Sequence, residues 1–108
     1  MGKRKFYVYE IKLKCGEANR CYIGQTKSIK DRWPMHISEM QRGTKHSSLW
    51  NSDFKNYGLE GFSFSILKIV DSKEEALAEE ERLIKEIGSL YNIDRERQRK
   101  LSESIHWI

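Results

Sequence analysis

The sequence predicts an α+β fold, in which a small three-stranded, mainly antiparallel sheet is flanked by helices. Three observations support this prediction: a hairpin pattern in residues 5–24, a strand-forming segment in residues 62–70, and helical periodicity in the segments between and after them. With 108 residues, 38% of them hydrophobic and one proline, the chain has the composition of one folded domain rather than of a disordered segment.

The hairpin begins in residues 5–15 (KFYVYEIKLKC), where apolar and polar side chains alternate. The alternation predicts one apolar face and one solvated face with Glu10, Lys12 and Lys14. The apolar face contains Tyr7, Tyr9, Ile11 and Leu13. The turn-forming residues GEAN follow, and RCYIG then forms the second strand, which makes residues 5–24 a hairpin.

A helix is expected in about residues 29–41, ending before Gly43. Pro34 donates no backbone hydrogen bond and fits best in the first turn, which favours Asp31 as N-cap. Arg32 would then lie at the positively polarised start of the helix, a plausible phosphate site, with His36 one turn further on. A kinked helix that starts at Ser28, with Asp31 closing a capping box, is the alternative. The apolar face consists of Ile29, Trp33, His36, Ile37 and Met40.

The remaining elements follow in order. Ser47 or Ser48 caps a shorter helix that ends before Gly58, and residues 62–70 (FSFSILKIV) form the strongest strand, expected at the centre of the sheet. Asp71 or Ser72 caps a third helix that runs to Ile87 and stops at Gly88. Residues 89–94 are expected to be extended, and the basic tail, residues 95–108, to be a last helix or the start of a linker.

Glu80 is the sharpest anomaly in the sequence. It lies near the middle of the predicted apolar stripe of the third helix, which consists of Leu77, Ile84, Ile87, Ala76 and Leu83. A carboxylate buried without a partner is costly, so such groups pair, bind a cation or take up a proton. A glutamate that reaches solvent from the edge of the stripe, or pairs with an arginine, is the competing interpretation.

The charge distribution is uneven, although the net charge is only +4, from 20 Lys and Arg against 16 Asp and Glu. Residues 3–42 are basic and the acidic residues gather in 71–86, which suggests one face suited to phosphates; a solvated basic surface is the alternative. No segment is long and apolar enough to span a membrane, and no signal peptide is evident. A cytoplasmic location is therefore expected, prokaryotic or phage-encoded within a host cell, with Cys15 and Cys21 reduced.

Taken together, these features resemble the GIY-YIG nuclease superfamily, above all the catalytic domains of phage-type homing endonucleases. The likeness covers about residues 5–94, with Tyr7-Val8-Tyr9 in place of the first motif and Tyr22-Ile23-Gly24 as the second. The residues that match the family pattern, in order, are Tyr9, Tyr22, Gly24, Arg32, His36, His46, Glu80 and Asn92. Tyr7 replaces the glycine of the first motif, and Pro34 stands where relatives often carry a basic residue.

The resemblance implies a chemistry. Glu80 would bind one divalent cation, Mg²⁺ or Mn²⁺, and Arg32 would stabilise the charge on the scissile phosphate. A tyrosine would take the proton from the attacking water, helped by His36; Tyr9 is favoured with Tyr22 as its hydrogen-bonding partner, although the residues leave the choice between the two tyrosines open. Gly24, His46 and Asn92 would support the site or bind substrate, and His46 either binds a phosphate or caps the second helix.

The resulting hypothesis is a metal-dependent DNA endonuclease, with residues 1–94 as catalytic domain and residues 95–108 as basic tail. A separate DNA-recognition module or partner is expected outside this chain, which is either an excised domain or a small stand-alone nuclease. Two alternatives are a non-catalytic nucleic-acid-binding module of the same fold and a protein-interaction domain. The interaction domain would use Trp107 as its exposed anchor, since Trp33 and Trp50 fit the core between helix and sheet.

Overall fold

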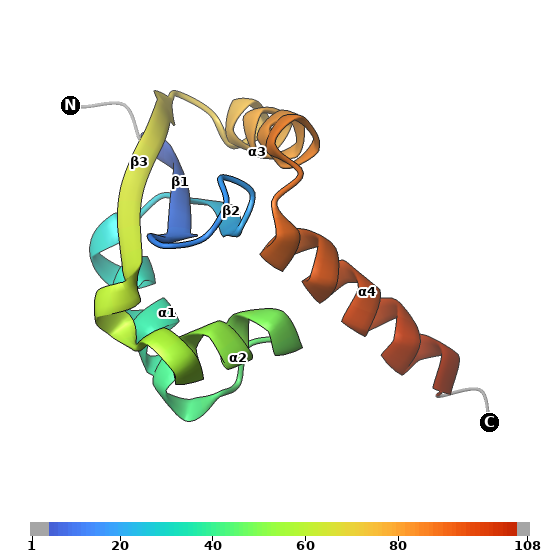
Figure 1. Ribbon diagram of the computed structural model, residues 1–108. Coiled ribbons are helices and arrows are strands. Elements are labelled where there is room, and N and C mark those ends of the chain that lie inside the picture. The colour runs from blue at the N-terminus through green and yellow to red at the C-terminus, as the bar shows by residue number, and fades with distance from the viewer. Residues whose placement is uncertain (1–4, 106–108) are drawn as a thin grey trace.

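The computed structural model describes residues 5–105 and has the predicted α+β architecture (Figure 1). Its strands are β1 (Phe6–Leu13), β2 (Cys21–Thr26) and β3 (Phe62–Val70). Its helices are α1 (Ile29–Arg42), α2 (Ser48–Tyr57), the short 3-10 helix η1 (Leu59–Gly61), α3 (Lys73–Ile87) and α4 (Leu90–Ile105). The hairpin, the strand in residues 62–70 and the three predicted helices are therefore all present.

The three strands pair antiparallel in the order β2-β1-β3, so β1 is the central strand. The expectation that residues 62–70 lie centrally is wrong, because β1 pairs with both of the other strands and leaves β3 at an edge with residues 65–69 exposed. The register of β1 with β3 shifts where Val8 faces Lys68 and Tyr9 faces Ile66, which leaves Leu67 without a partner. Such an irregularity bends the strand pair beside Tyr9.

Side chains are buried on both faces of the sheet. The larger core cluster packs against α1, α2 and the start of α4, and contains Tyr9, Ile11, Leu13, Met40, Trp50, Phe62 and Tyr91. The second lies under α3 and contains Val8, Cys21, Ile23, Val70 and Ala76. The second face of β1 is thus not a solvated one: Val8 is fully buried there, and Glu10 and Lys12 are half-buried.

Helix α1 begins earlier than its proline suggests. Ser28 is the N-cap, and its hydroxyl accepts a hydrogen bond from the Asp31 N–H at 3.3 Å. The Asp31 N-cap is therefore wrong: the Arg32 N–H already donates to the Ser28 carbonyl at 3.0 Å, so Arg32 is the fourth helical residue and does not flank free N–H groups. Pro34 lies inside the helix. It removes one intrahelical hydrogen bond near the N-terminus, and the burial of His36 and Met40 holds the helix in place.

Helices α2 and α3 have the predicted caps. Ser47 accepts from the Trp50 N–H and Ser72 from the Glu75 N–H, and Gly58 and Gly88 follow the last residues. One residue of the predicted α3 stripe is misplaced, because Leu77 is 45% exposed. Its neighbour Ala76 is fully buried instead, and Leu83, Ile84 and Ile87 are partly buried against the same cluster.

Helix α4 is the largest departure from the sequence prediction. Residues 89–94 are not extended, because the helix begins at Leu90, and Figure 1 shows it running from β2 outward, away from the sheet. Tyr91 anchors this first turn in the core, where it stacks on Trp50 with ring centroids 5.1 Å apart. The helical tail agrees with the prediction up to Ile105, and the position 94/95 falls within this one helix.

The tryptophans fall into two groups. Trp50 is buried in the core and Trp33 packs against it, as predicted, whereas Trp107 lies outside the described residues. No helix in residues 5–105 has the length and apolar character needed to cross a membrane.

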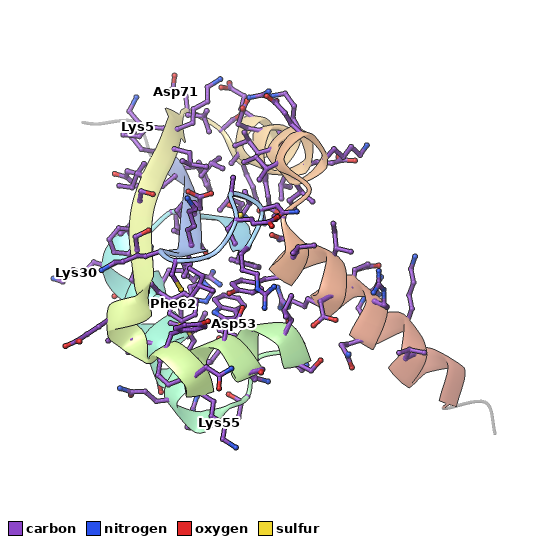
Figure 2. The ribbon with its side chains drawn as sticks, viewed as in Figure 1. Lys5, Lys30, Asp53, Lys55, Phe62 and Asp71 are labelled. Atoms are coloured by element: carbon purple, nitrogen blue, oxygen red, sulfur yellow. The ribbon has the colours of Figure 1, made fainter. Side chains whose placement is uncertain are left out.

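An ion pair between the half-buried Arg20 and the buried Asp53 joins the hairpin turn, α2 and α4. Arg20 donates from Nε to Asp53 Oδ2 at 2.7 Å and from a terminal nitrogen to Oδ1 at 3.0 Å. The Tyr91 hydroxyl donates to Asp53 Oδ2 at 2.7 Å. Asp53 is labelled in Figure 2 between α2 and the sheet. This cluster anchors the first turn of α4 through Tyr91.

Candidate active site

Gly24 makes room for the hydroxyl of Tyr9. The two residues face each other across β1 and β2, and a Cβ on Gly24 would lie 2.5 Å from the Tyr9 oxygen and 2.8 Å from the Tyr22 ring. Any side chain at this position would displace at least one tyrosine. The glycine of the YIG motif is thus needed here for close approach.

Tyr9 is hydrogen-bonded to His36. The Tyr9 oxygen lies 2.7 Å from His36 Nε2, and Tyr9 and His36 are 1% and 4% exposed. Burial raises the pKa of Tyr9, the charges of Tyr22 and Glu80 raise it further, and those of Arg32 and Arg95 oppose the shift. The expectation that Tyr22 is the hydrogen-bonding partner of Tyr9 is wrong, since α1 brings His36 to that oxygen.

Tyr22 faces the cleft beside α4. Its hydroxyl accepts a hydrogen bond from Arg95 at 3.2 Å, and its ring stacks on Trp50 with centroids 5.0 Å apart. Burial raises the pKa of Tyr22, and the charges of Arg95 and Arg32 oppose that shift. The two tyrosines therefore have different partners: a buried imidazole for Tyr9 and a surface guanidinium for Tyr22.

Lys45 contacts the other side of His36. Its ammonium lies against His36 Nδ1, donates to Glu39 Oε1 at 2.8 Å, and lies 4.3 Å from the centre of the Trp50 ring. Burial lowers the pKa of His36 to about 3, and the charges of Lys45, Arg32 and Arg95 act in the same direction. His36 is therefore a neutral imidazole at neutral pH.

Arg32 and Glu80 are half-buried and have no direct partner. Neither side chain forms a hydrogen bond or an ion pair with a residue that the structure describes. Burial raises the pKa of Glu80, with the charge of Arg95 opposing it. The guanidinium of Arg32 and the carboxylate of Glu80 are therefore both available to bind a ligand.

Glu80 is the carboxylate that this region offers to a metal ion, because the nearby Glu39, Glu81 and Glu96 pair with Lys45, Lys85 and Arg99. Within residues 5–105, no three His, Cys, Asp or Glu side chains cluster as a set of metal ligands. This composition fits Mg²⁺, which usually keeps several waters and takes one or two protein carboxylates plus substrate phosphate oxygens. It does not fit a structural zinc site, which needs four protein ligands.

Most of these groups line two adjoining hollows, whereas the buried Tyr9 is not among the lining residues of either. The smaller one is lined by Tyr22, Arg32, Met35, His36, Glu39, Thr44, Lys45, His46, Trp50 and Arg95. The larger one is an open groove of about 1550 Å³ between α2, α3 and α4, to which α3 contributes Glu80. His46 is exposed, and together with Lys45 and Arg95 it borders both hollows. We refer to the two hollows together as the cleft.

Asn92 connects α4 to β2. Its side-chain oxygen accepts from the Ile23 N–H at 2.7 Å, and its amide nitrogen donates to the Ile23 carbonyl at 2.9 Å. The Ser89 hydroxyl also donates to the Asn92 oxygen. These hydrogen bonds tie the first turn of α4 to the strand that carries Tyr22 and Gly24.

The structure thus brings the residues of the family pattern into one region, in which Asn92 lines the larger hollow and His46 borders both, whereas Tyr9 and Gly24 are not among the lining residues. It also adds two cations that the sequence reasoning missed, Lys45 and Arg95. A lysine next to the predicted His46 carried no signal of burial. Arg95 follows a segment that was expected to be extended, so its position beside Tyr22 was not predictable from that expectation.

Comparisons with known proteins identify the family of the chain. Residues 5–92 match the GIY-YIG catalytic domain. The chain is also 29% identical, over 86 residues, to Intron-associated endonuclease 1 of Enterobacteria phage T4. That alignment covers 79% of this chain and 34% of the relative, so the chain spans about a third of the relative's length. No solved structure matches the chain significantly. The match over most of its length establishes that this chain belongs to the GIY-YIG family of nuclease catalytic domains.

Proposed function

We propose that this chain is a metal-dependent endonuclease that hydrolyses phosphodiester bonds in DNA. The observation that carries the proposal is the state of Arg32 and Glu80, which are half-buried, opposite in charge and unpaired with any described residue. Holding such groups without partners costs free energy. A phosphodiester for Arg32 and a divalent cation for Glu80 would supply the missing partners when the substrate binds.

Glu80 would hold the cation, Mg²⁺ or Mn²⁺, through its one carboxylate. When bound there, the ion supplies Lewis-acid stabilisation of phosphoryl oxygens and orients the substrate. Arg32 would donate N–H groups to the oxygens of the scissile phosphate. Because a guanidinium is planar, always charged and held ready on α1, it stabilises the negative charge that develops as the phosphorus is attacked.

Tyr9 would take the proton from the attacking water, and we assign the role to Tyr9 because of its contact with His36. A hydrogen bond donated to a phenolate oxygen favours the ionised form, and so do the nearby charges of Arg32 and Arg95. The buried phenol remains mostly protonated at neutral pH, so the cleavage rate should rise with pH. Tyr22, held by Arg95, would contact the substrate at the mouth of the cleft.

The DNA backbone would be bound along the groove beside α4. Cationic side chains on that wall come from one helix, which contributes Arg95, Arg97, Arg99 and Lys100. Glu81 and Glu96 also border the groove, so the attraction would be moderate. Contacts of this kind are made to phosphates rather than to base edges, and they predict binding that weakens with salt and depends little on sequence.

The test is nicking of supercoiled plasmid at low salt with Mg²⁺, comparing the wild type with Glu80→Gln. Glu86→Gln is the matched control, because Glu86 lies on the same helix, is exposed and pairs with Arg82. We expect metal-dependent nicking that EDTA and Glu80→Gln abolish and Glu86→Gln retains. Glu80→Gln should unfold at the same temperature as the wild type or higher, because it removes a carboxylate whose pKa burial raises.

A folded wild type that binds DNA but does not nick it under these conditions would contradict the catalytic proposal. That result would favour the alternative, a non-catalytic nucleic-acid-binding module. If Glu80→Gln nicks DNA at the full rate, Glu80 is not the metal ligand, and the assignment as a nuclease is unaffected.

A further inference from the structure

Lys45 is a buried cation that the mechanism above does not use. Its side chain is 6% exposed, and it lies in the segment that connects α1 to α2. Burial lowers its pKa, and the hydrogen bond to Glu39 acts in the opposite direction. Placing a lysine here therefore costs free energy, and its contact with His36 suggests what the residue does.

The chemistry of the contacts determines where the His36 proton lies. An ammonium has three donors and no acceptor, and its hydrogen bond to the Glu39 carboxylate favours the charged form. Nδ1 of His36 must then accept from Lys45. Because His36 is neutral, its single ring proton is on Nε2, the atom that lies 2.7 Å from the Tyr9 oxygen.

We infer that Lys45 is a positioning residue, which holds His36 in the Nε2–H tautomer so that the imidazole donates to the Tyr9 oxygen and does not accept its proton. The inference rests on the proposed role of Tyr9 as the base. It assigns a direction to the Tyr9–His36 hydrogen bond, which the family match leaves open. The phenol proton is then lost to solvent rather than to His36, and the phenolate oxygen later takes up the proton of the attacking water.

The arrangement favours the Tyr9 phenolate, because a fixed donor stabilises the ionised form and is lost if the tautomer changes. The charged and titratable groups that act on Tyr9 are Tyr22, Arg32, Glu80 and Arg95. Those that act on His36 are Lys45, Arg32 and Arg95, and those that act on Lys45 are Glu39, Arg95 and Arg32. Among these groups, Lys45 is the one hydrogen-bonded to His36 Nδ1.

The direct test is the tautomer of His36, read from the ¹⁵N NMR shifts of its ring in the full chain without metal or DNA. We expect Nε2 to be protonated and Nδ1 to be unprotonated in the wild type. In Lys45→Met, both tautomers should be populated, because nothing then requires Nδ1 to accept. A wild type with the proton on Nδ1 would overturn the inference, whether or not the chain cleaves DNA.

The second test is the rate of cleavage by Lys45→Met at neutral pH, with Lys55→Met as the control. Lys55 is exposed on α2 (Figure 2) and is not among the residues that line either hollow. Loss of the fixed donor raises the pKa of Tyr9, so the rate at neutral pH should fall about tenfold for each unit of the rise. Lys55→Met should cleave at the wild-type rate.

A purely structural role for Lys45 would give another result. The rate of Lys45→Met would then fall while the His36 proton stays on Nε2 in that variant, and that result would contradict the inference. If Lys45→Met does not fold, as judged by thermal unfolding, the tautomer in the wild type still decides the question. If the wild type lacks nuclease activity, the proposed function fails, and the NMR result stands separately.

Discussion

Two half-buried arginines, Arg20 and Arg32, differ in what surrounds them. Arg20 makes two hydrogen bonds to Asp53, and Asp53 also accepts from Tyr91, so the charges of that cluster are matched. Arg32 forms no hydrogen bond or ion pair with any residue that the structure describes. The same residue type at similar burial thus stabilises the fold in one place and is left open to the cleft in the other.

The carboxylates of the two regions show the same contrast. Burial alone would raise the pKa of Asp53, but the hydrogen bonds from Arg20 and Tyr91 outweigh it, and the pKa is lowered. Burial raises the pKa of Glu80 because no donor compensates it. A buried charge that the fold satisfies is structural, whereas one that the fold leaves unsatisfied is a candidate for function.

Exchanging each arginine for methionine should separate the two regions, and this is the largest effect we expect. Arg32→Met should reduce nicking by about 10²–10³-fold, the usual loss when one preorganised donor to a developing oxyanion is removed, with little change in stability. Arg20→Met should lower the free energy of unfolding by about 3 kcal/mol, because it leaves Asp53 buried with Tyr91 alone. Urea unfolding and plasmid nicking, measured on both variants, check this double prediction.

The opposite pattern would contradict the proposed difference between Arg20 and Arg32. If Arg32→Met destabilised the protein as much as Arg20→Met and cleaved normally per folded molecule, Arg32 would be a structural residue. The assignment of the cleft as an active site would then lose its main support.

The sequence was sufficient for the elements whose signals are local. The hairpin of β1 and β2, the serine caps of α2 and α3 and the glycines after them depend on neighbouring residues, and each was found where predicted. The position of β3 at the sheet edge was not predictable in this way, because its strand-forming residues favour pairing without specifying on how many sides. The first turn of α4 failed for a related reason, since the burial of Tyr91 decides its conformation.

In the candidate site, too, the residues with a local signal were identified from the sequence and those that depend on contacts between elements were not. Glu80 was found because a carboxylate interrupted an apolar stripe, a pattern that one helix carries by itself. Lys45 and Arg95 were missed because their importance comes from contacts with His36 and Tyr22, which lie on other elements. The wrong prediction of the Tyr9 partner has the same origin. The pairing of the two strands favoured Tyr22, whereas the packing of α1 places His36 at the Tyr9 oxygen.

Gly24→Ala tests the candidate site by changing its shape rather than its charge. The new methyl carbon would lie 2.5 Å from the Tyr9 oxygen, so the Tyr9 ring must move away from His36. Overpacking of this kind costs about 1–3 kcal/mol of stability. Cleavage per folded molecule should also fall, whereas Gly43→Ala, at a helix end outside the cleft, should affect stability alone. Normal cleavage by Gly24→Ala would show that the Tyr9–His36 contact is dispensable.

The dependence of stability on pH distinguishes the two regions by where each titrates. The pKa of His36 is lowered to about 3 from an unfolded value near 6.5, so between these values the unfolded chain binds a proton that the folded chain does not. Stability should therefore decrease as the pH falls from about 6.5 toward 3, by up to about 1.4 kcal/mol per unit. The lowered pKa of Asp53 gives a contribution that is present above about 3.8 and lost below it.

Chemical unfolding between pH 6.5 and 4.5 therefore isolates the site from the structural cluster. His36→Gln should flatten the decrease in this range, whereas Asp53→Asn should lower stability at every pH and leave the slope unchanged. Glu80, whose pKa is raised, contributes with the opposite sign, so the difference between the wild type and His36→Gln is the quantity to compare. Equal slopes for these two proteins would mean that His36 titrates alike in the folded and unfolded chains, which is incompatible with a neutral imidazole fixed between Lys45 and Tyr9.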